Sequence, residues 1–229
     1  KNNCGQIRKT RNSFIMLGIS MLVLAYFLLI PGAEQLRDLQ AQVKPTVSLY
    51  SNPKPLGEKF PLINDEGQII SLAEAVKNKW AILYFGYTSC PDVCPTDLAT
   101  LNQTLKSMQY ADKLQIVFIS VDPNRDVGRL SDFTQKFNSK FIGLSAKEEV
   151  LNKMTKMLGV YHEVSQTKQR ATKNHSNHKA MKTNNNYLIN HTASYLLLNP
   201  KLELIGLLTN PHYAKKMAKA LDLIIETLD

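Results

Sequence analysis

The sequence contains few cysteines and lacks the motifs of two common classes of catalytic site. Only three cysteines occur among 229 residues, at positions 4, 90 and 94. It has no glycine-rich phosphate loop, and no serine, histidine and aspartate follow one another in an order typical of a catalytic triad. These absences argue against a nucleotide-dependent enzyme and against a serine hydrolase.

Acidic residues are missing from the first 33 positions, which instead hold four lysine and arginine residues. Residues 14–30 are uncharged and apolar, enough for a helix of about 25 Å, near the lower limit for crossing a bilayer. The positive-inside rule then predicts a basic cytoplasmic tail at residues 1–13, a transmembrane anchor at residues 14–31 and an exported remainder.

A cleaved signal peptide is the alternative, because Gly32 and Ala33 are small enough for a processing site. The apolar run is longer than a usual signal core, and Cys4 precedes it, so it carries no lipobox. We favour an anchor in a bacterial inner membrane with the domain in the periplasm, since we find no transit peptide before it. A mitochondrial inner membrane facing the intermembrane space is the second possibility.

The net charge of +9 is concentrated in two segments. Residues 1–33 and 162–191 each carry +4, whereas residues 34–161 carry +1 and residues 192–229 are neutral. A nucleic-acid-binding protein needs positive charge on a folded face. The nearly neutral globular part therefore argues against nucleic-acid binding.

The remaining pattern predicts a linker at residues 32–55 and a single α/β domain at residues 56–229. Prolines 45, 53 and 55 exclude a continuous helix and favour an extended spacer. Alternating strands and helices predict a parallel sheet with crossover helices. Strands are expected at residues 80–87, 114–121, 194–198 and 202–208. Helices are expected directly after the first of these strands, with Pro95 in the first turn, and at 34–43, 127–137, 146–158 and 213–228. Residues 162–190 are polar without a helical or strand period, which predicts a long inserted loop.

Cys90 and Cys94 stand where the first buried strand gives way to a helix, the edge at which open α/β sheets bind ligands. Helix N-termini favour thiolates, and a Cys-x-x-x-Cys spacing brings both sulfurs to one helical face. Soft thiolates select Cu(I) or zinc, and His191 is a candidate third ligand that would complete a trigonal Cu(I) site. Zinc usually takes a fourth ligand. A disulfide for the cysteines and a structural role for the histidine are the common alternatives.

Three segments resemble signatures of the Sco/SenC family of copper-binding assembly factors. The segment YFGYTSCPDVCP at residues 84–95 is similar to the first, FISVDP at 118–123 with Arg125 and Asp126 to the second, and INHTA at 189–193 to the third. The resemblance covers about residues 55–229 and the single anchor.

This resemblance implies a thioredoxin-like fold in which Cys90, Cys94 and His191 match the copper ligands. The implied function is to bind Cu(I), or also Cu(II), and deliver it to the dinuclear copper centre of cytochrome c oxidase during assembly. Its implied partners are the copper-bearing oxidase subunit and other copper chaperones or thiol reductants. The alternative function is a thiol–disulfide oxidoreductase in which Cys90 attacks and Cys94 resolves. A peroxidase-like relative is a weaker third possibility.

Two departures from the family pattern concern the histidine segment. Asn190 stands where the family usually has aspartate, which removes a negative charge beside the ligand. His175 and His178 offer extra copper ligands, but we favour a solvated insertion.

Asp92 and Asp122 are weaker candidate site residues. A helix cap explains Asp92 equally well, and a turn beside Pro123 explains Asp122.

Overall fold

The structure is a computed structural model that describes residues 20–21, 34–56, 60–160, 162–166, 187–191 and 194–229. It divides into two compact units, Lys1–Gln42 and Val43–Asp229. Residues 34–43 form the helix that the sequence predicts. The predicted anchor lies almost entirely outside the described residues, and within the described ranges no helix is both long and apolar enough to span a bilayer.

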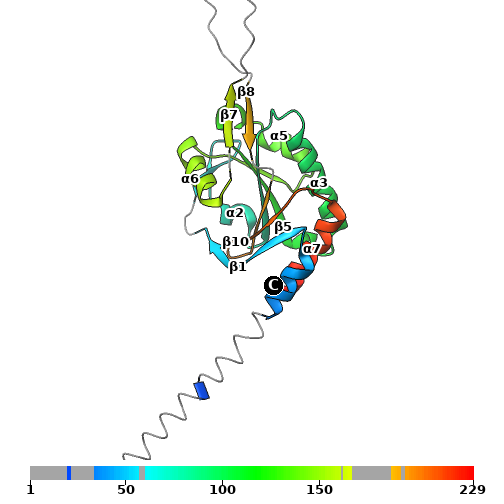
Figure 1. The fold of residues 1–229 in the computed structure, drawn as a ribbon. Helices are drawn as coiled ribbons and strands as arrows, with labels where there is room; N and C mark the ends of the chain where they lie inside the picture. Colours follow the sequence, from blue (N-terminus) through cyan, green and yellow to red (C-terminus); the bar gives the residue numbers. More distant parts are fainter. Residues whose placement is uncertain (1–19, 22–33, 57–59, 161, 167–186, 192–193) are drawn as a thin grey trace, which may run out of the picture. The chain divides into compact units, whose positions relative to one another are not determined.

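A six-stranded sheet forms the centre of the second unit, with strand order β1-β10-β9-β4-β5-β6 (Figure 1). The strands β4, β5 and β6 are parallel, whereas β9, β10 and β1 join them in antiparallel fashion. Their bounds are β1 Val47–Pro55, β4 Trp80–Gly86, β5 Leu114–Ser120, β6 Ile142–Leu144, β9 Tyr195–Leu198 and β10 Glu203–Leu208.

The predicted parallel arrangement holds for β4, β5 and β6, whereas the sheet as a whole is mixed. The connection from β9 to β10 is a tight turn in which the Leu202 N–H donates to the Asn199 carbonyl at 2.9 Å. So short a connection permits only an antiparallel neighbour, because a parallel one needs a crossover of a dozen or more residues.

The predicted spacer is wrong over residues 47–55, which form the edge strand β1. Val47 pairs with Leu208, and Pro55 pairs with Glu203 at the other end of the ladder. The register shifts between Leu49 and Lys54, so this strand is irregular. Prolines are tolerated at such an edge because only one side of the strand is paired.

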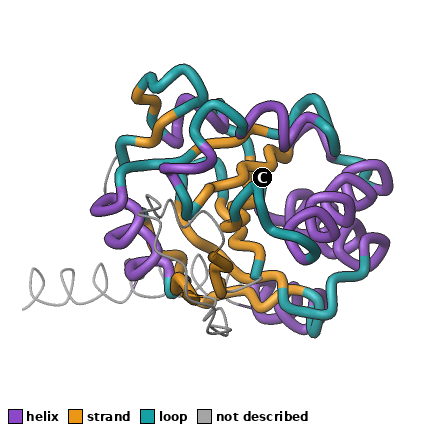
Figure 2. Tube along the Cα trace, turned by 90° about the horizontal axis from the view of Figure 1, so that it is seen from above, coloured by secondary structure: helices purple, strands orange, loops and turns teal. Residues whose placement is uncertain are grey.

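Helices lie on both sides of the sheet (Figure 2). The two longest in the second unit are α3, Val93–Ser107, and α7, Ala214–Leu228, and they contact each other. Their apolar faces are buried, as the helical spacing predicts. The shorter helices are α2 Leu72–Val76, a 3-10 turn at Ala111–Lys113, α4 Pro123–Asp126, α5 Leu130–Gln135 and α6 Glu148–Leu158.

Two short hairpins complete the described fold. The first pairs β2, Leu62–Ile63, with β3, Ile69–Ile70. The second pairs β7, His162–Gln166, with β8, Tyr187–His191, as a separate antiparallel sheet (Figure 1).

The second hairpin corrects the prediction that residues 162–190 form a loop throughout. Both ends of that segment are strands, while residues 167–186 lie outside the described part of the chain. The composition of the segment is polar, but five residues on each side suffice for a ladder, and a ladder needs only backbone groups. Composition averaged over the whole segment hides two such short strands.

Candidate metal centre

The two cysteines lie at the junction between β4 and α3. Cys90 belongs to the loop after β4, and Cys94 lies in the first turn of α3. Both are thiols. The Cys94 side chain is fully buried, whereas Cys90 keeps 9% of its surface exposed. The predicted position at a strand-to-helix junction is confirmed.

A backbone hydrogen bond links the two residues. The Cys94 N–H donates to the Cys90 sulfur at 3.4 Å, and the Cys90 N–H donates to the Tyr87 carbonyl at 3.2 Å. The amide at residue 94 is one of the N–H groups that the helix itself leaves unsatisfied at its N-terminus. Such a donor stabilises negative charge on the Cys90 sulfur.

The surroundings of the buried Cys94 sulfur favour the protonated thiol instead. The hydrogen bond with Cys90 and burial raise the pKa of the Cys94 thiol far above its usual value. Burial, together with neighbouring Cys94 and Asp97, likewise raises the pKa of Tyr84. The Cys94 sulfur is therefore a protonated thiol in the metal-free protein, and a soft metal ion would displace that proton on binding.

Gly86, the last residue of β4, makes room for the Cys94 sulfur. A β-carbon at this position would lie 2.9 Å from the Cys94 sulfur and 2.8 Å from the Phe118 ring. Any larger residue would push one of these neighbours away. The sulfur thus packs directly on the backbone of the central strand.

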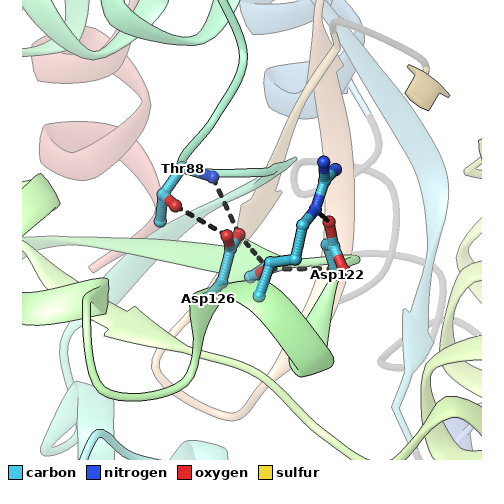
Figure 3. A network of polar contacts seen from close by, with 5 residues as sticks. Thr88, Asp122 and Asp126 are labelled. Atoms are coloured by element: carbon cyan, nitrogen blue, oxygen red, sulfur yellow. Dashed lines mark hydrogen bonds and ion pairs between the residues drawn. The ribbon is translucent and has the colours of Figure 1, made fainter. Parts of the chain in front are cut away.

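Asp126 in α4 ties the cysteine loop to the end of β5 (Figure 3). Its side chain is fully buried and accepts hydrogen bonds from the Thr88 N–H at 2.8 Å and the Thr88 hydroxyl at 2.6 Å. The Ser120 hydroxyl donates to the same carboxylate at 2.6 Å. Thr88 stands two positions before Cys90, so this buried carboxylate fixes the loop that carries the first thiol.

The sequence does not indicate this role of Asp126. It places the residue within the second family-like segment without a function of its own. Its position next to Arg125 after a predicted strand gave no sign that its partner is Thr88, 38 positions away.

Asp122 lies beside this network and forms an ion pair with Arg125. The Arg125 guanidinium stands over the Tyr87 ring, 5.8 Å from its centroid. Asp122 therefore helps to hold the cysteine loop in place through Arg125 and Tyr87. The sequence indicated only a turn at this position.

Asp92 occupies the N-cap position of α3, but its side chain makes no capping hydrogen bond. The capping interpretation of Asp92 is therefore wrong. Pro91, Asp92 and Val93 are all exposed, and Val93 retains 46% of its surface. The segment between the two cysteines thus faces the outside of the domain.

A second buried polar cluster, which the sequence did not reveal, begins one helical turn after Cys94. The Tyr195 hydroxyl donates to Asp97 Oδ1 at 3.0 Å, and the His212 ring stacks on the Tyr195 ring with centroids 3.9 Å apart. His212 Nδ1 lies 3.5 Å from Asp97 Oδ1. The cluster ties α3 to β9 and to the segment before α7, which fixes the helix that carries Cys94.

The third predicted ligand, His191, is the last residue of β8 and pairs with His162 across the ladder. Within the described part of the chain, no three histidine, cysteine, aspartate or glutamate residues gather as a metal site. The predicted meeting of His191 with the cysteines stays a prediction. His175 and His178 lie outside the described residues, and Asn190 pairs with Glu163.

Comparison with known proteins identifies the family. The SCO1/SenC family model matches residues 49–226. The SCO2-like protein of Rickettsia conorii is 33% identical over 65% of this chain and 72% of its own length. The mitochondrial protein SCO1 homolog 1 of Arabidopsis thaliana is 26% identical over 84% of this chain, which spans only 54% of that relative.

Solved structures agree. The crystal structure of Arabidopsis thaliana ScoI with copper bound has a TM-score of 0.61 at 26% identity, covering 75% of this chain and 98% of that one. Bradyrhizobium japonicum ScoI with copper bound has a TM-score of 0.58 at 28% identity, covering 72% and 96%. The predicted family and the thioredoxin-like α/β fold are thus confirmed, and the chain belongs to the SCO1/SenC family.

Proposed function

We propose that this chain is a copper metallochaperone that holds Cu(I), and also Cu(II), between Cys90, Cys94 and His191. In this proposal the chain delivers the ion to the dinuclear copper centre of cytochrome c oxidase during assembly. The observation that carries the proposal is the pair of adjacent thiols at the head of α3, joined by the 3.4 Å contact from the Cys94 N–H to the Cys90 sulfur.

The donor set favours copper over harder metals. Two thiolates and one imidazole are soft ligands, and three such donors are enough for Cu(I). Two relatives of similar fold have been solved with copper bound, which supports the same cargo here. Zinc in a structural site usually takes four protein ligands, one more than this set provides.

The difference in burial between the two sulfurs suggests an order of exchange. Cys90 is the more accessible sulfur and adjoins the exposed segment 91–93, whereas Cys94 is sealed against Gly86. A partner's ligand therefore meets Cys90 first, and Cys94 releases the ion last. The Asp126 network holds the loop in place during this exchange.

The proposed partners follow from the proposed cargo. The segment 91–93 and its surroundings would dock the copper-bearing oxidase subunit, and other copper chaperones or thiol reductants would reload or reduce the site. We further propose the basic tail at residues 1–13 and the transmembrane anchor at residues 14–31, with the domain in the bacterial periplasm or, as the alternative, in the mitochondrial intermembrane space.

A thiol–disulfide oxidoreductase is the second candidate function. It is favoured by the same helix N-terminal N–H, which stabilises a thiolate at Cys90, the more exposed sulfur. In that reaction the Cys90 thiolate attacks a partner disulfide, and Cys94 then attacks the mixed disulfide to release the reduced partner. The chain is left with a Cys90–Cys94 disulfide.

Titration of the reduced chain with Cu(I) against a competing chromophoric chelator tests the first function. We expect one Cu(I) per chain, with binding lost in Cys90→Ser and Cys94→Ser and strongly weakened in His191→Ala. His175→Ala serves as the matched control and should bind as the unmodified chain does.

The His191→Ala variant also separates the two functions. Under the copper proposal its affinity collapses while its dithiol still exchanges with a small disulfide. Unchanged copper affinity in this variant would exclude His191 as a ligand. Copper binding that survives both cysteine substitutions would exclude the proposed site altogether.

A further inference from the structure

A groove lies between α3 and the start of α7, two helices that contact each other (Figure 1). Its volume is about 700 Å³, within the range of about 300–1,000 Å³ that is usual for ligand sites. The groove is open to solvent and is lined by four residues of α3 and by residues 212–216. An open groove of this size can hold a short segment of another chain.

The α3 wall of the groove begins two positions after Cys94. Residues spaced by three or four positions lie on one helical face, and this wall consists of Thr96, Ala99, Thr100 and Gln103. It extends over about 10 Å, the length of about three extended residues. All four side chains are uncharged. A segment in the groove would therefore run along the helix that carries the second proposed ligand without meeting charge on this wall.

The opposite wall combines positive charge with an exposed aromatic ring. Lys215 and Lys216 are exposed, and Tyr213 retains 55% of its surface. The Lys216 Nζ stands 4.9 Å from the centroid of the Tyr213 ring. His212, whose side chain is only 4% exposed, adds a buried imidazole to the lining. Among the described residues that line the groove, none is acidic, so its charge is positive.

Helix stability does not explain the position of the two lysines. Lys215 and Lys216 lie in the first turn of α7, where the helix dipole is positive and acidic residues are favoured. That turn has no acidic residue, and Tyr213 at the N-cap makes no side-chain capping hydrogen bond. The lysines thus oppose the dipole of their own helix. Negatively charged groups in the groove would relieve this repulsion.

We propose that the groove docks an acidic segment of the protein that exchanges copper with the site, an inference that rests on the function proposed above. Carboxylates of this segment pair with Lys215 and Lys216, and an apolar side chain packs on Tyr213. The polar segment of this chain at residues 162–191 carries +4, so it is not a complementary occupant. Because the groove begins less than one helical turn after Cys94, docking there brings the partner to the proposed metal site.

The combination of charge and ring favours a peptide over a small anion. Exposed charges speed association and select the partner, whereas a large aromatic side chain contributes most of its binding energy by burying apolar area. A small anion would use the lysines alone. A peptide with both carboxylates and an apolar side chain uses the lysines, the Tyr213 ring and the uncharged α3 wall together.

Fluorescence anisotropy tests the docking on the reduced, metal-free full chain in nanodiscs of phosphatidylcholine. The probe is the peptide Glu-Asp-Leu-Glu-Asp with a neutral dye at its N-terminus, and its matched control is Gln-Asn-Leu-Gln-Asn. We expect saturable binding of the acidic peptide alone, weakened by added salt because exposed charges are screened. Replacing the central leucine of the probe by alanine should weaken binding further. Equal affinities for the acidic and the amide peptide would overturn the proposal.

Variants locate the binding in the groove. Lys215→Gln combined with Lys216→Gln keeps good helix formers and should lower the affinity about fivefold, because two exposed ion pairs are lost. Lys147→Gln combined with Lys156→Gln removes the same charge from exposed positions at α6 and should change nothing. Tyr213→Ser removes the ring but supplies a preferred N-cap residue, so weaker binding there does not come from a frayed helix. Equal affinities of the two double variants would overturn the proposal.

Two competitors distinguish other occupants of the groove. Inorganic phosphate, compared with chloride at equal ionic strength, should not displace the peptide, and neither should vesicles of phosphatidylglycerol. Displacement by phosphate would show a general anion site. Displacement by the vesicles would assign the groove to an anionic membrane surface. Either displacement would overturn the assignment to an acidic protein segment.

Copper transfer connects the groove with the proposed function. Cu(I) should pass from the loaded chain to a dithiol acceptor peptide faster when the acceptor carries the acidic segment than when it carries the amide version. This difference should vanish in the double variant at Lys215 and Lys216. Equal rates for both acceptors would overturn the docking role even where copper binds normally. If the chain instead binds no copper while the acidic peptide still binds the groove, only the proposed function is wrong.

Discussion

Gly86 and Cys94 are in such close contact that a β-carbon at residue 86 would stand 2.9 Å from the Cys94 sulfur. The last residue of the central strand therefore sets where the second thiol lies. The same β-carbon would meet the Phe118 ring at 2.8 Å, so neither neighbour can give way without disturbing the core.

We expect Gly86→Ala to lower both stability and copper affinity. Overpacking of a core typically costs about 1–3 kcal/mol of unfolding free energy, and here part of the displacement falls on a proposed ligand. Urea unfolding and Cu(I) competition titration measure the two effects.

Gly143→Ala is the matched control for this prediction. A β-carbon at Gly143 would approach the Leu130 β-carbon to 2.8 Å, an equally tight contact in a different part of the core. We expect Gly143→Ala to lower the unfolding free energy by a similar amount and to leave copper affinity unchanged. Equal copper affinities in both variants would mean that Gly86 does not position the thiol.

Asp126→Asn should loosen the cysteine loop. The carboxylate accepts two hydrogen bonds from Thr88 and one from Ser120. Hydrogen bonds to a charged group contribute about 1.5–3 kcal/mol each, and an amide provides only one acceptor oxygen. We therefore expect a loss of at least about 2 kcal/mol in unfolding free energy.

The loosening should also be visible at the thiols. Hydrogen exchange at the Thr88 and Cys90 amides should speed up in Asp126→Asn, and Cu(I) should dissociate faster. Thr88→Val removes one of the three hydrogen bonds and should give a smaller effect of the same kind. An Asp126→Asn variant with unchanged copper dissociation would show that the network serves stability alone.

Asp65 should make the stability of the domain depend on pH. Its carboxylate accepts hydrogen bonds from the N–H groups of Gly128, Leu130 and Ser131 at 3.0, 2.8 and 2.6 Å. Burial raises the pKa of Asp65, but these donors outweigh it and hold that pKa below its ordinary value of 3.8. The stabilisation is therefore complete above that value and is lost as the pH falls through the lowered pKa.

Substituting this residue gives a direct test. Asp65→Asn should lower the unfolding free energy by about 1 kcal/mol at pH 7, as loss of a helix-capping side chain does. The difference from the unmodified chain should disappear at pH values below the lowered pKa. A difference for Asp65→Asn that stays constant across this pH range would contradict the assignment.

Asn190 stands where the family usually has aspartate, and its direct partner in the β7–β8 ladder is Glu163. Like charges directly opposite each other destabilise an antiparallel pair. Asn190→Asp alone should therefore weaken the hairpin and give no gain in Cu(II) affinity. The double variant Asn190→Asp with Glu163→Gln should bind Cu(II) more tightly than either single variant, measured by competition titration.

The junction that carries the cysteines could be predicted from the sequence because its signals are local. The run at residues 80–86 contains almost only apolar residues, and the helical spacing after Val93 is regular, so strand, loop and helix follow from their own composition. The spacing of Cys90 and Cys94 relative to that helix places both sulfurs near its N-terminus.

The edge strand and the hairpin could not be predicted in the same way. Residues 47–55 contain prolines that favour an extended conformation, but their pairing with β10 depends on a strand some 150 positions later. The short strands at residues 162–166 and 187–191 are stabilised by each other across an intervening polar segment. The residues of either segment taken alone therefore do not predict these strands.

The sequence by itself determined the central strands, the family and the two thiols at the head of a helix, because each depends on residues close together in the chain. Only the tertiary structure decided that Asp126 accepts hydrogen bonds from Thr88, that Asp97 accepts one from Tyr195, and that His162 pairs with His191 in the β7–β8 ladder. These partners are 38, 98 and some 30 positions apart, and hydrogen bonds and ladder register over such distances arise from packing of the whole domain.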